Sequence, residues 1–206
     1  MNTRRERKNE MRKVVAVEYV TLDGVITDPG GAGEIEHGGW SNRYFDDELA
    51  EVQTDQLFAS DALLLGRVTF EGFAAAWPSM EETEGAFAVR MNALPKFVAS
   101  TTLREPLAWN GTLLKEDVAE EVAKLKAQPG QDLLIYGSGE LVNALHAQGL
   151  IDEYRLIVFP VTLGQGKHLF SEGPDKRDLR LSEAKTTRTG VTLLTYLPSG
   201  DQSHDV

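Results

Sequence analysis

Short apolar runs alternate with helical stretches along most of this chain, and this alternation restricts the fold more than any other feature. Runs rich in branched apolar residues predict buried strands, whereas apolar residues spaced three and four apart predict amphipathic helices. The expected strands are residues 14–20, 62–65, 96–100, 112–114, 132–136 and 151–159. The expected helices between them are residues 46–59, 69–76, 86–92, 118–127 and 140–148. Such alternation predicts an α/β fold with a largely parallel sheet.

The C-terminal part of the chain departs from this alternation. Residues 179–187 and 190–196 both read as strands, with only a short turn between them. We therefore expect a mixed, mostly parallel central sheet that carries an antiparallel C-terminal hairpin. Residues 13–198 are expected to form one domain, preceded by a disordered polar leader at 1–12 and followed by a polar tail at 199–206.

Charge and composition narrow the class of partner. The 206 residues include 21 Lys and Arg against 32 Asp and Glu, a formal net charge of −11, which argues against nucleic acid or an anionic membrane as a partner. No apolar run approaches the ~20 residues of a membrane span. The chain has no cysteine, and its four histidines show no metal-ligand spacing with carboxylates, so no metal site is expected. We expect a cytoplasmic protein that binds a small molecule.

The strand-to-helix junction at residues 63–71 is the most informative stretch for function, although Gly-Arg-x-Thr is a short motif of low specificity by itself. The apolar run ends at Gly66, Arg67 follows it, and Thr69 opens the expected helix. A helix start presents unpaired N–H groups, and here it adds a cation and a hydroxyl, so the junction suits a phosphate. In the alternative interpretation, Arg67 is a surface cation paired with a nearby carboxylate and Thr69 is an ordinary N-cap.

A second junction follows the expected strand 132–136. Gly137-Ser138-Gly139 forms the turn, and Glu140 and Leu141 begin the next helix. Glycine permits positive φ and a close approach of a ligand to the backbone. The turn is not a Gly-x-Gly-x-x-Gly fingerprint, because Val142 stands where the third glycine belongs. A tight turn without a ligand is the alternative, but two such junctions together favour a phosphate-rich cofactor such as a dinucleotide.

Other polar residues follow the ends of expected strands, where open α/β sheets bind ligands. Ser100 and Thr101 come after the third strand, and Asp23 comes after the first. Each has a structural alternative, in which the side chain bonds only its own turn. His37 and Trp40 lie in a Gly-rich loop at 28–40, where they could cover a substrate or simply anchor the loop.

These pieces, in this order, resemble the dihydrofolate reductase-like fold and, more closely, the RibD C-terminal domain family, the reductase domain of the bifunctional riboflavin-biosynthesis deaminase/reductases. The resemblance covers residues 13–197. It is carried by the segments 21–26, 65–71, 96–103, 135–141 and 159–166.

The resemblance implies a three-layer αβα fold and NADPH as the cofactor. Its phosphates would be held by the two junctions, whose residues are Gly66, Arg67, Thr69, Gly137, Ser138, Gly139, Glu140 and Leu141. Ser100 and Thr101 would lie near the adenosine end, and Asp23 would face the substrate. Pro160 and the residues up to 166 would line the opposite wall. Independently of the resemblance, the place of Trp40 and His37 in the Gly-rich loop predicts that one or the other closes over this cleft. The resemblance also implies a homodimer formed through residues 153–160 and the terminal hairpin.

The leading hypothesis is an NADPH-dependent reductase of a small heterocyclic substrate, similar to 5-amino-6-(5-phosphoribosylamino)uracil reductase, with Asp23 assisting proton transfer. One alternative is a non-catalytic nucleotide-binding or regulatory module on the same fold. Another is a pterin or dihydrofolate-type reductase, although the acidic residues of helix 46–59 do not match that family in neighbours and spacing. A zinc deaminase centre with cysteine ligands is excluded.

Overall fold

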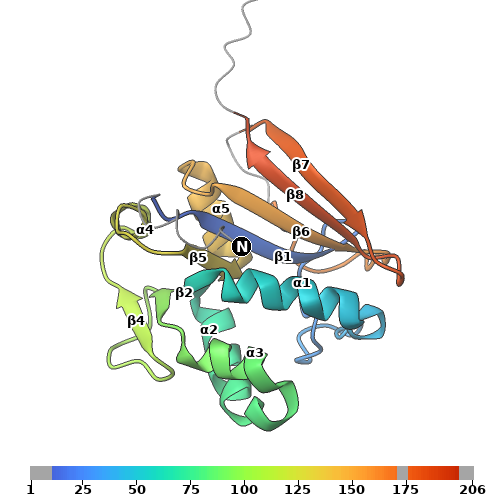
Figure 1. Ribbon diagram of the computed structural model, residues 1–206, viewed down its shortest axis with the longest axis horizontal. Coiled ribbons are helices and arrows are strands. Elements are labelled where there is room, and N and C mark those ends of the chain that lie inside the picture. The colour runs from blue at the N-terminus through green and yellow to red at the C-terminus, as the bar shows by residue number, and fades with distance from the viewer. Residues whose placement is uncertain (1–10, 171–175, 200–206) are drawn as a thin grey trace, which may run out of the picture.

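The computed structural model describes residues 11–170 and 176–199, which build one eight-stranded sheet with helices on both faces (Figure 1). The strands are β1 (Val14–Thr21), β2 (Ser60–Gly66), β3 (Lys96–Ala99), β4 (Gly111–Leu114), β5 (Asp132–Tyr136), β6 (Glu153–Phe159), β7 (Leu179–Thr186) and β8 (Thr192–Pro198). The helices are α1 (Asp47–Phe58), α2 (Arg67–Ala76), α3 (Glu81–Ala93), α4 (Val118–Lys126) and α5 (Gly139–Ala147). Two 3₁₀ turns, η2 (Asn42–Tyr44) and η3 (Trp77–Ser79), precede α1 and α3.

The strand order is β4-β3-β2-β5-β1-β6-β8-β7, with β4 and the hairpin β7–β8 at opposite ends of the sheet (Figure 1). The pairs among β1 to β6 are parallel, whereas β8 pairs antiparallel with β6 and β7. This confirms the predicted mixed, mostly parallel sheet with an antiparallel hairpin. β5 is inserted between β2 and β1, so the turns that follow these three strands emerge side by side at the carboxyl edge of the parallel strands.

Two hydrophobic cores lie on opposite faces of the sheet and give the fold its three layers. One core packs α4 and α5 against the sheet through Val122, Leu141 and Leu145. The other packs α1, α2 and α3 through residues such as Leu49 and Phe70. Because both faces are covered, β1 is apolar and buried at nearly every position, as expected of a central parallel strand. Glu18 is the exception within that run.

The starts of two helices differ from the prediction. α2 begins at Arg67, with Gly66 in the N-cap position, so Thr69 lies inside the first turn and is not the N-cap. The interpretation of Thr69 as a cap is therefore wrong. α3 begins five residues earlier than residue 86, because its first turn is acidic and lacks the apolar spacing that marked the rest. Gly85, with φ +55°, interrupts this helix.

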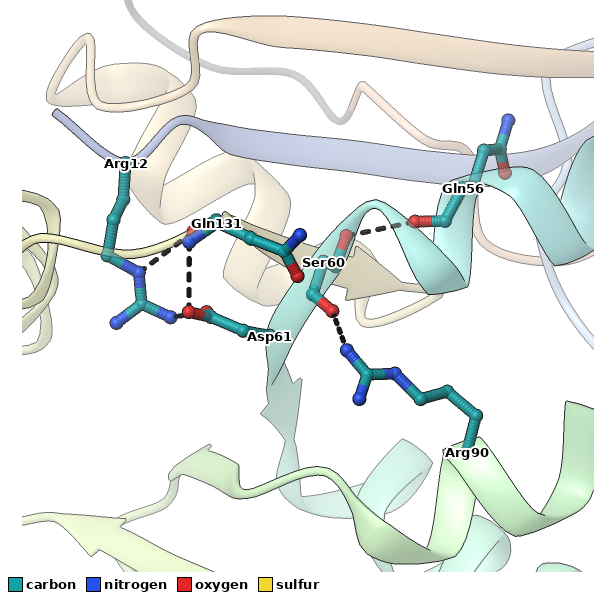
Figure 2. A network of polar contacts seen from close by, with 6 residues as sticks. All are labelled: Arg12, Gln56, Ser60, Asp61, Arg90 and Gln131. Carbon is teal, nitrogen blue, oxygen red and sulfur yellow. Dashed lines mark hydrogen bonds and ion pairs between the residues drawn. The ribbon is translucent and has the colours of Figure 1, made fainter. Parts of the chain in front are cut away.

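The amino edge of the parallel strands is held by a network of polar contacts (Figure 2). Asp61 forms an ion pair with Arg12 and accepts a hydrogen bond from the Gln131 backbone N–H at 2.9 Å. Arg12 Nε also donates to the Gln131 carbonyl at 2.9 Å. Arg90 of α3 donates to the Ser60 carbonyl at 2.5 Å. These contacts fasten residue 12, β2, the segment before β5 and α3 together.

The predicted boundaries can be compared with the structure only in part. Arg12, which fell in the predicted leader, is buried and bonded in this network. The disorder predicted for residues 1–10 and the tail at 200–206 lie outside the described residues. In the described part of the chain, no helix has the length and apolar character needed to cross a membrane.

Candidate functional site

The two predicted phosphate junctions are adjacent in the structure. The Gly66 backbone N–H donates a hydrogen bond to Ser138 Oγ at 3.0 Å, although the two residues are 72 positions apart. A Cβ placed on Gly137 would lie 3.6 Å from the Thr69 side chain. The starts of α2 and α5 therefore converge at the carboxyl ends of β2 and β5.

The capping of the helices separates this pair from others in the fold. α1 begins at Asp46, which accepts a hydrogen bond from Leu49 N–H, and α4 begins at Asp117, which accepts from Ala119 and Glu120. Within residues 11–170, no side chain caps the start of α2 or α5. α3 also lacks a side-chain cap, but it carries three glutamates in its first turn, which would repel an anion. The starts of α2 and α5 thus leave N–H donors open. The acidic residue in the first turn of α5, Glu140, is paired with Lys167.

The backbone of the second turn has the conformation expected of a ligand-binding turn. Gly137 has φ +56° and Ser138 has φ +66°, so two successive residues lie in the left-handed region. This confirms the prediction of positive φ at one of the turn's glycines. Gly139 has an ordinary φ, but a Cβ on it would lie 2.3 Å from Ile26 Cδ1. The segment after β1 therefore covers the start of α5.

Charges of both signs surround these helix starts. Arg67 Nη1 donates to Glu71 Oε2 at 2.8 Å on its own helix, and both side chains are about half exposed. This is the carboxylate pairing that the sequence left open as an alternative. Glu140 pairs with Lys167 at 2.8 Å. The hydrogen bond from Lys167 lowers the pKa of Glu140 first, and nearby Arg67 lowers it further. Two cations therefore stand near the open donors, each held by one carboxylate.

Asp23 fastens the segment after β6 to the end of β1. Its carboxylate accepts hydrogen bonds from Leu163 N–H at 3.0 Å, from Gly164 N–H at 2.7 Å and from Thr21 Oγ1. The Thr21 hydroxyl and then the Gly164 amide hold the pKa of Asp23 below its ordinary value. The carboxylate is thus ionised at neutral pH and engaged by backbone donors 140 residues away in sequence. Its direct role in this geometry is to hold a loop.

A cleft of about 560 Å³ opens beside this loop. Residues 36–40 with Asn42 and Arg43 form one wall, and residues 161–163 form the other. His37 and Trp40 both line it, so the structure places these two predicted residues together. Trp40 is buried, donates through Nε1 to the Thr27 carbonyl at 2.8 Å and packs edge-on against Phe159, so it anchors the loop as well. Pro160 lies next to the wall, with its carbonyl accepting from Tyr44 Oη at 3.1 Å.

Ser100 and Thr101 follow β3, next to β2 at the same edge of the sheet. Ser100 Oγ accepts hydrogen bonds from the N–H groups of Thr102 at 3.1 Å and Leu103 at 3.0 Å, so it stabilises its own turn. Arg104 Nη1 donates to the carbonyl of Leu103 at 3.0 Å and to those of the two threonines before it. The guanidinium of Arg104 thereby lies against the backbone that follows β3.

Sequence reasoning missed three residues of this region. Ile26 and Lys167 reach the start of α5 from segments that are distant in sequence, and no local pattern marks them. Glu18 is different, because a single glutamate within the apolar run 14–20 is visible in the sequence. It is 2% exposed, and burial raises its pKa to about 8.

Comparison with known proteins identifies the family. The family model described as the RibD C-terminal domain matches residues 12–194. The chain belongs to this family. The uncharacterised protein YyaP of Bacillus subtilis (strain 168) is 32% identical over 189 residues, which span 91% of this chain and 95% of that protein.

Solved structures show the same fold as this RibD C-terminal domain. A Shewanella sp. PV-4 protein whose name assigns it, provisionally, to riboflavin biosynthesis superposes with a TM-score of 0.70 at 22% identity, covering 91% of this chain and 99% of that chain. The Thermotoga maritima diaminohydroxyphosphoribosylaminopyrimidine deaminase/5-amino-6-(5-phosphoribosylamino)uracil reductase gives 0.61 at 14% identity, covering 92% and 57%. Enterococcus faecalis dihydrofolate reductase complexed with NADP(H) gives 0.57 at 13%, covering 92% and 98%. The dihydrofolate reductase-like fold is confirmed, and the family supports a reductase-type function.

Proposed function

We propose that this protein is a cytoplasmic, NADPH-dependent reductase of a small heterocyclic compound, of the kind named for the Thermotoga maritima relative. One observation carries the proposal: the uncapped starts of α2 and α5 converge, joined by the hydrogen bond from Gly66 N–H to Ser138 Oγ. Open N–H donors at paired helix starts suit the pyrophosphate of a dinucleotide. The positive φ values at Gly137 and Ser138 turn additional backbone groups toward the position proposed for the pyrophosphate.

The residues around these helix starts fit the rest of such a cofactor. Backbone N–H groups of Gly139, Glu140 and Leu141 in the first turn of α5 would hold the phosphates. Arg67, with Ser100, Thr101 and Arg104 on the neighbouring strand end, would receive the 2′-phosphate and so favour NADPH over NADH. When bound, the cofactor supplies a hydride to the substrate.

The cleft beside the loop at 161–163 would hold the substrate. His37 and Trp40 form one wall, and Asp23 fixes the opposite wall through its bonds to Leu163 and Gly164. Proton transfer by Asp23, which the sequence suggested, stays a prediction. Asp23→Asn separates the two roles: a loop anchor raises the substrate KM with little change in kcat, whereas a proton-transfer group lowers kcat by about 10²-fold.

Calorimetric titration of the protein with NADPH and, separately, with NADH tests the cofactor assignment. We expect NADPH to bind more tightly, and Arg67→Ala to weaken NADPH about tenfold while leaving NADH nearly unchanged, as for loss of one charge-assisted contact. Lys124→Ala, which removes an exposed cation that pairs with Glu121 on its own helix, is the matched control. Equal affinities for the two cofactors in wild type and mutant would contradict the assignment.

A turnover assay then separates an enzyme from a binding module. NADPH oxidation is followed with phosphoribosylamino-pyrimidine and dihydropterin substrates. Consumption with the pyrimidine supports the proposed class, and consumption with dihydrofolate alone points to a pterin reductase. Tight NADPH binding with no turnover of either class favours a non-catalytic nucleotide-binding module.

We also propose that the protein is a homodimer formed through β6 and the terminal hairpin. Side chains of β8 such as Leu193, Leu194 and Tyr196 are only partly buried, which leaves apolar surface at this end of the sheet. Light scattering should report about twice the chain mass of 22.7 kDa. A single chain mass at micromolar concentration contradicts this assembly.

A further inference from the structure

Glu18 is a buried acid near the proposed cofactor site, and its Oε1 has no hydrogen-bond partner among the residues that the structure describes. The residue is 2% exposed. Buried polar atoms without a partner cost free energy and are rare in native proteins, so each calls for a reason. Neither the phosphate-binding helix starts nor the cleft uses this carboxyl group.

The register of the sheet places Glu18 at the level of the ligand-binding turn. Val17 pairs with Tyr136, the last residue of β5, and its carbonyl accepts from Gly137 N–H at 3.3 Å. Glu18 is therefore level with the first residue of the turn. Its neighbours on the same face of β1, Ala16 and Val20, belong to the core under α5, so the Glu18 side chain lies on the α5 face of the sheet.

Strand order indicates which part of a dinucleotide would come to this place. The phosphate donors lie at the ends of β2 and β5, and the adenosine end is proposed at β3, on one side of them. The next strand on the other side is β1, and beyond it β6 leads to the cleft at 161–163. A cofactor that runs along this edge from the turn at Gly137 would cross β1 near the level of Glu18, with its nicotinamide ring between the phosphates and the cleft.

The nicotinamide ring is neutral when reduced and cationic when oxidised, which gives it a reason to lie against a carboxyl group. Resting on the proposed function, we propose that Glu18 faces the nicotinamide end of the cofactor site and gives up its proton when the oxidised form binds. The carboxylate then pairs with the cationic ring, and the protonated form suits the neutral ring. Glu18 thereby shifts the protein's preference between the two forms of the cofactor with pH.

In the protein without cofactor, the Glu18 carboxyl group is protonated near neutral pH, as the proposal requires. Burial raises the pKa of Glu18 to about 8, and no neighbouring charge contributes to this shift. Other titratable side chains on the elements that pack against this face include Glu120, Glu121, Lys124 and Lys126 of α4, and Asp132, Glu140, His146, Tyr154, Lys167, His168 and Tyr196. Glu140 is paired with Lys167 in solvent, and His146 Nδ1 lies 2.7 Å from Tyr154 Oη. Lys126 pairs with Asp152 near the amino edge.

The test compares the dissociation constants of NADP⁺ and NADPH from roughly pH 6 to pH 8. Release of one proton on binding NADP⁺ makes the ratio Kd(NADP⁺)/Kd(NADPH) fall with rising pH, by up to about tenfold per pH unit. Both cofactors carry the same 2′-phosphate, so its own titration cancels in the ratio. Glu18→Gln should make the ratio independent of pH. Glu153→Gln, which neutralises another buried carboxylate at the start of β6, should keep the slope.

Infrared difference spectra give a second readout that does not depend on a folded mutant. Addition of NADP⁺ to the wild type should remove a protonated carboxyl band, and addition of NADPH should not. Binding of both forms with equal pH slopes and no loss of the band overturns the role of Glu18 and leaves the proposed function standing. If NADP⁺ or NADPH fails to bind, the role of Glu18 and the proposed function are both overturned.

Discussion

The two edges of the parallel strands are built for different tasks. At the amino edge, Asp61 binds Arg12 and the Gln131 backbone N–H (Figure 2). Asp152 binds Lys126 and the Val14 N–H at the same edge. At the carboxyl edge, the starts of α2 and α5 keep their N–H groups open. Closed polar contacts stabilise the fold, whereas open donors are available to a ligand and add nothing to stability until one binds.

The strongest test of this difference is to cap the open N–H groups at the carboxyl edge with a side chain. Ser138→Asp would give α5 the kind of cap that α1 and α4 already have. A carboxylate at the helix start competes for the N–H donors and repels phosphate, so NADPH affinity should fall by at least about 100-fold with the fold intact. Calorimetry measures the loss. Asp117→Ala at α4 is the counterpart, and should cost about 1 kcal/mol of stability and leave NADPH affinity unchanged.

The amino edge should respond in the opposite way. Arg12→Ala leaves Asp61 without its cation, and breaking a fully buried pair costs about 3–5 kcal/mol. Asp61 is one-third exposed, so we expect roughly 2 kcal/mol from urea unfolding. NADPH affinity per folded molecule should not change. A mutant as stable as wild type, or one with altered cofactor affinity, would show that the two edges are not separate in function.

The buried carboxyl group of Glu18 makes the stability of the fold depend on pH. Its folded pKa is raised from 4.5 to about 8, so between these values the native state holds a proton that the unfolded state has released. Stability should therefore fall as pH rises through this window, by at most about 1.4 kcal/mol per pH unit. Glu18→Gln should remove this slope and be more stable than wild type near pH 8. Thermal unfolding across the window measures it, and parallel curves for the two proteins would contradict the assignment.

The smallest expected effect concerns the pair of Arg67 and Glu71. Glu71→Gln frees the guanidinium from its carboxylate at 2.8 Å and removes one negative charge near the proposed phosphate site. Exposed pairs of this kind are worth about 0.3–0.5 kcal/mol, so NADPH should bind about twofold more tightly at low salt. The gain should fade as salt is added. Weaker NADPH binding by Glu71→Gln would mean that the pair itself positions Arg67.

Much of the fold could be predicted because it rests on local patterns. Residues 132–136 coincide with β5, and the helix predicted at 118–127 overlaps α4 to within one residue. The turn at Gly137 was predicted from glycine alone, and its positive φ confirms it. The start of α2 was misplaced because Gly66 serves as N-cap without a side chain, which gives no sequence signal. The Arg67–Glu71 pairing was open to sequence reasoning, since the two residues are four apart on one helix.

The sequence by itself determined the alternation of strands and helices, the two glycine junctions and the cation beside one of them, because these follow from local periodicity and backbone freedom. Only the tertiary structure decided that the junctions meet, since β5 had to insert between β2 and β1 before Gly66 could reach Ser138. It also decided that Asp23 holds a loop 140 residues away and that Glu18 is buried, with no hydrogen bond to its Oε1 from any residue in 11–170 or 176–199. Such contacts depend on strand order and packing between distant segments, which no window of sequence contains.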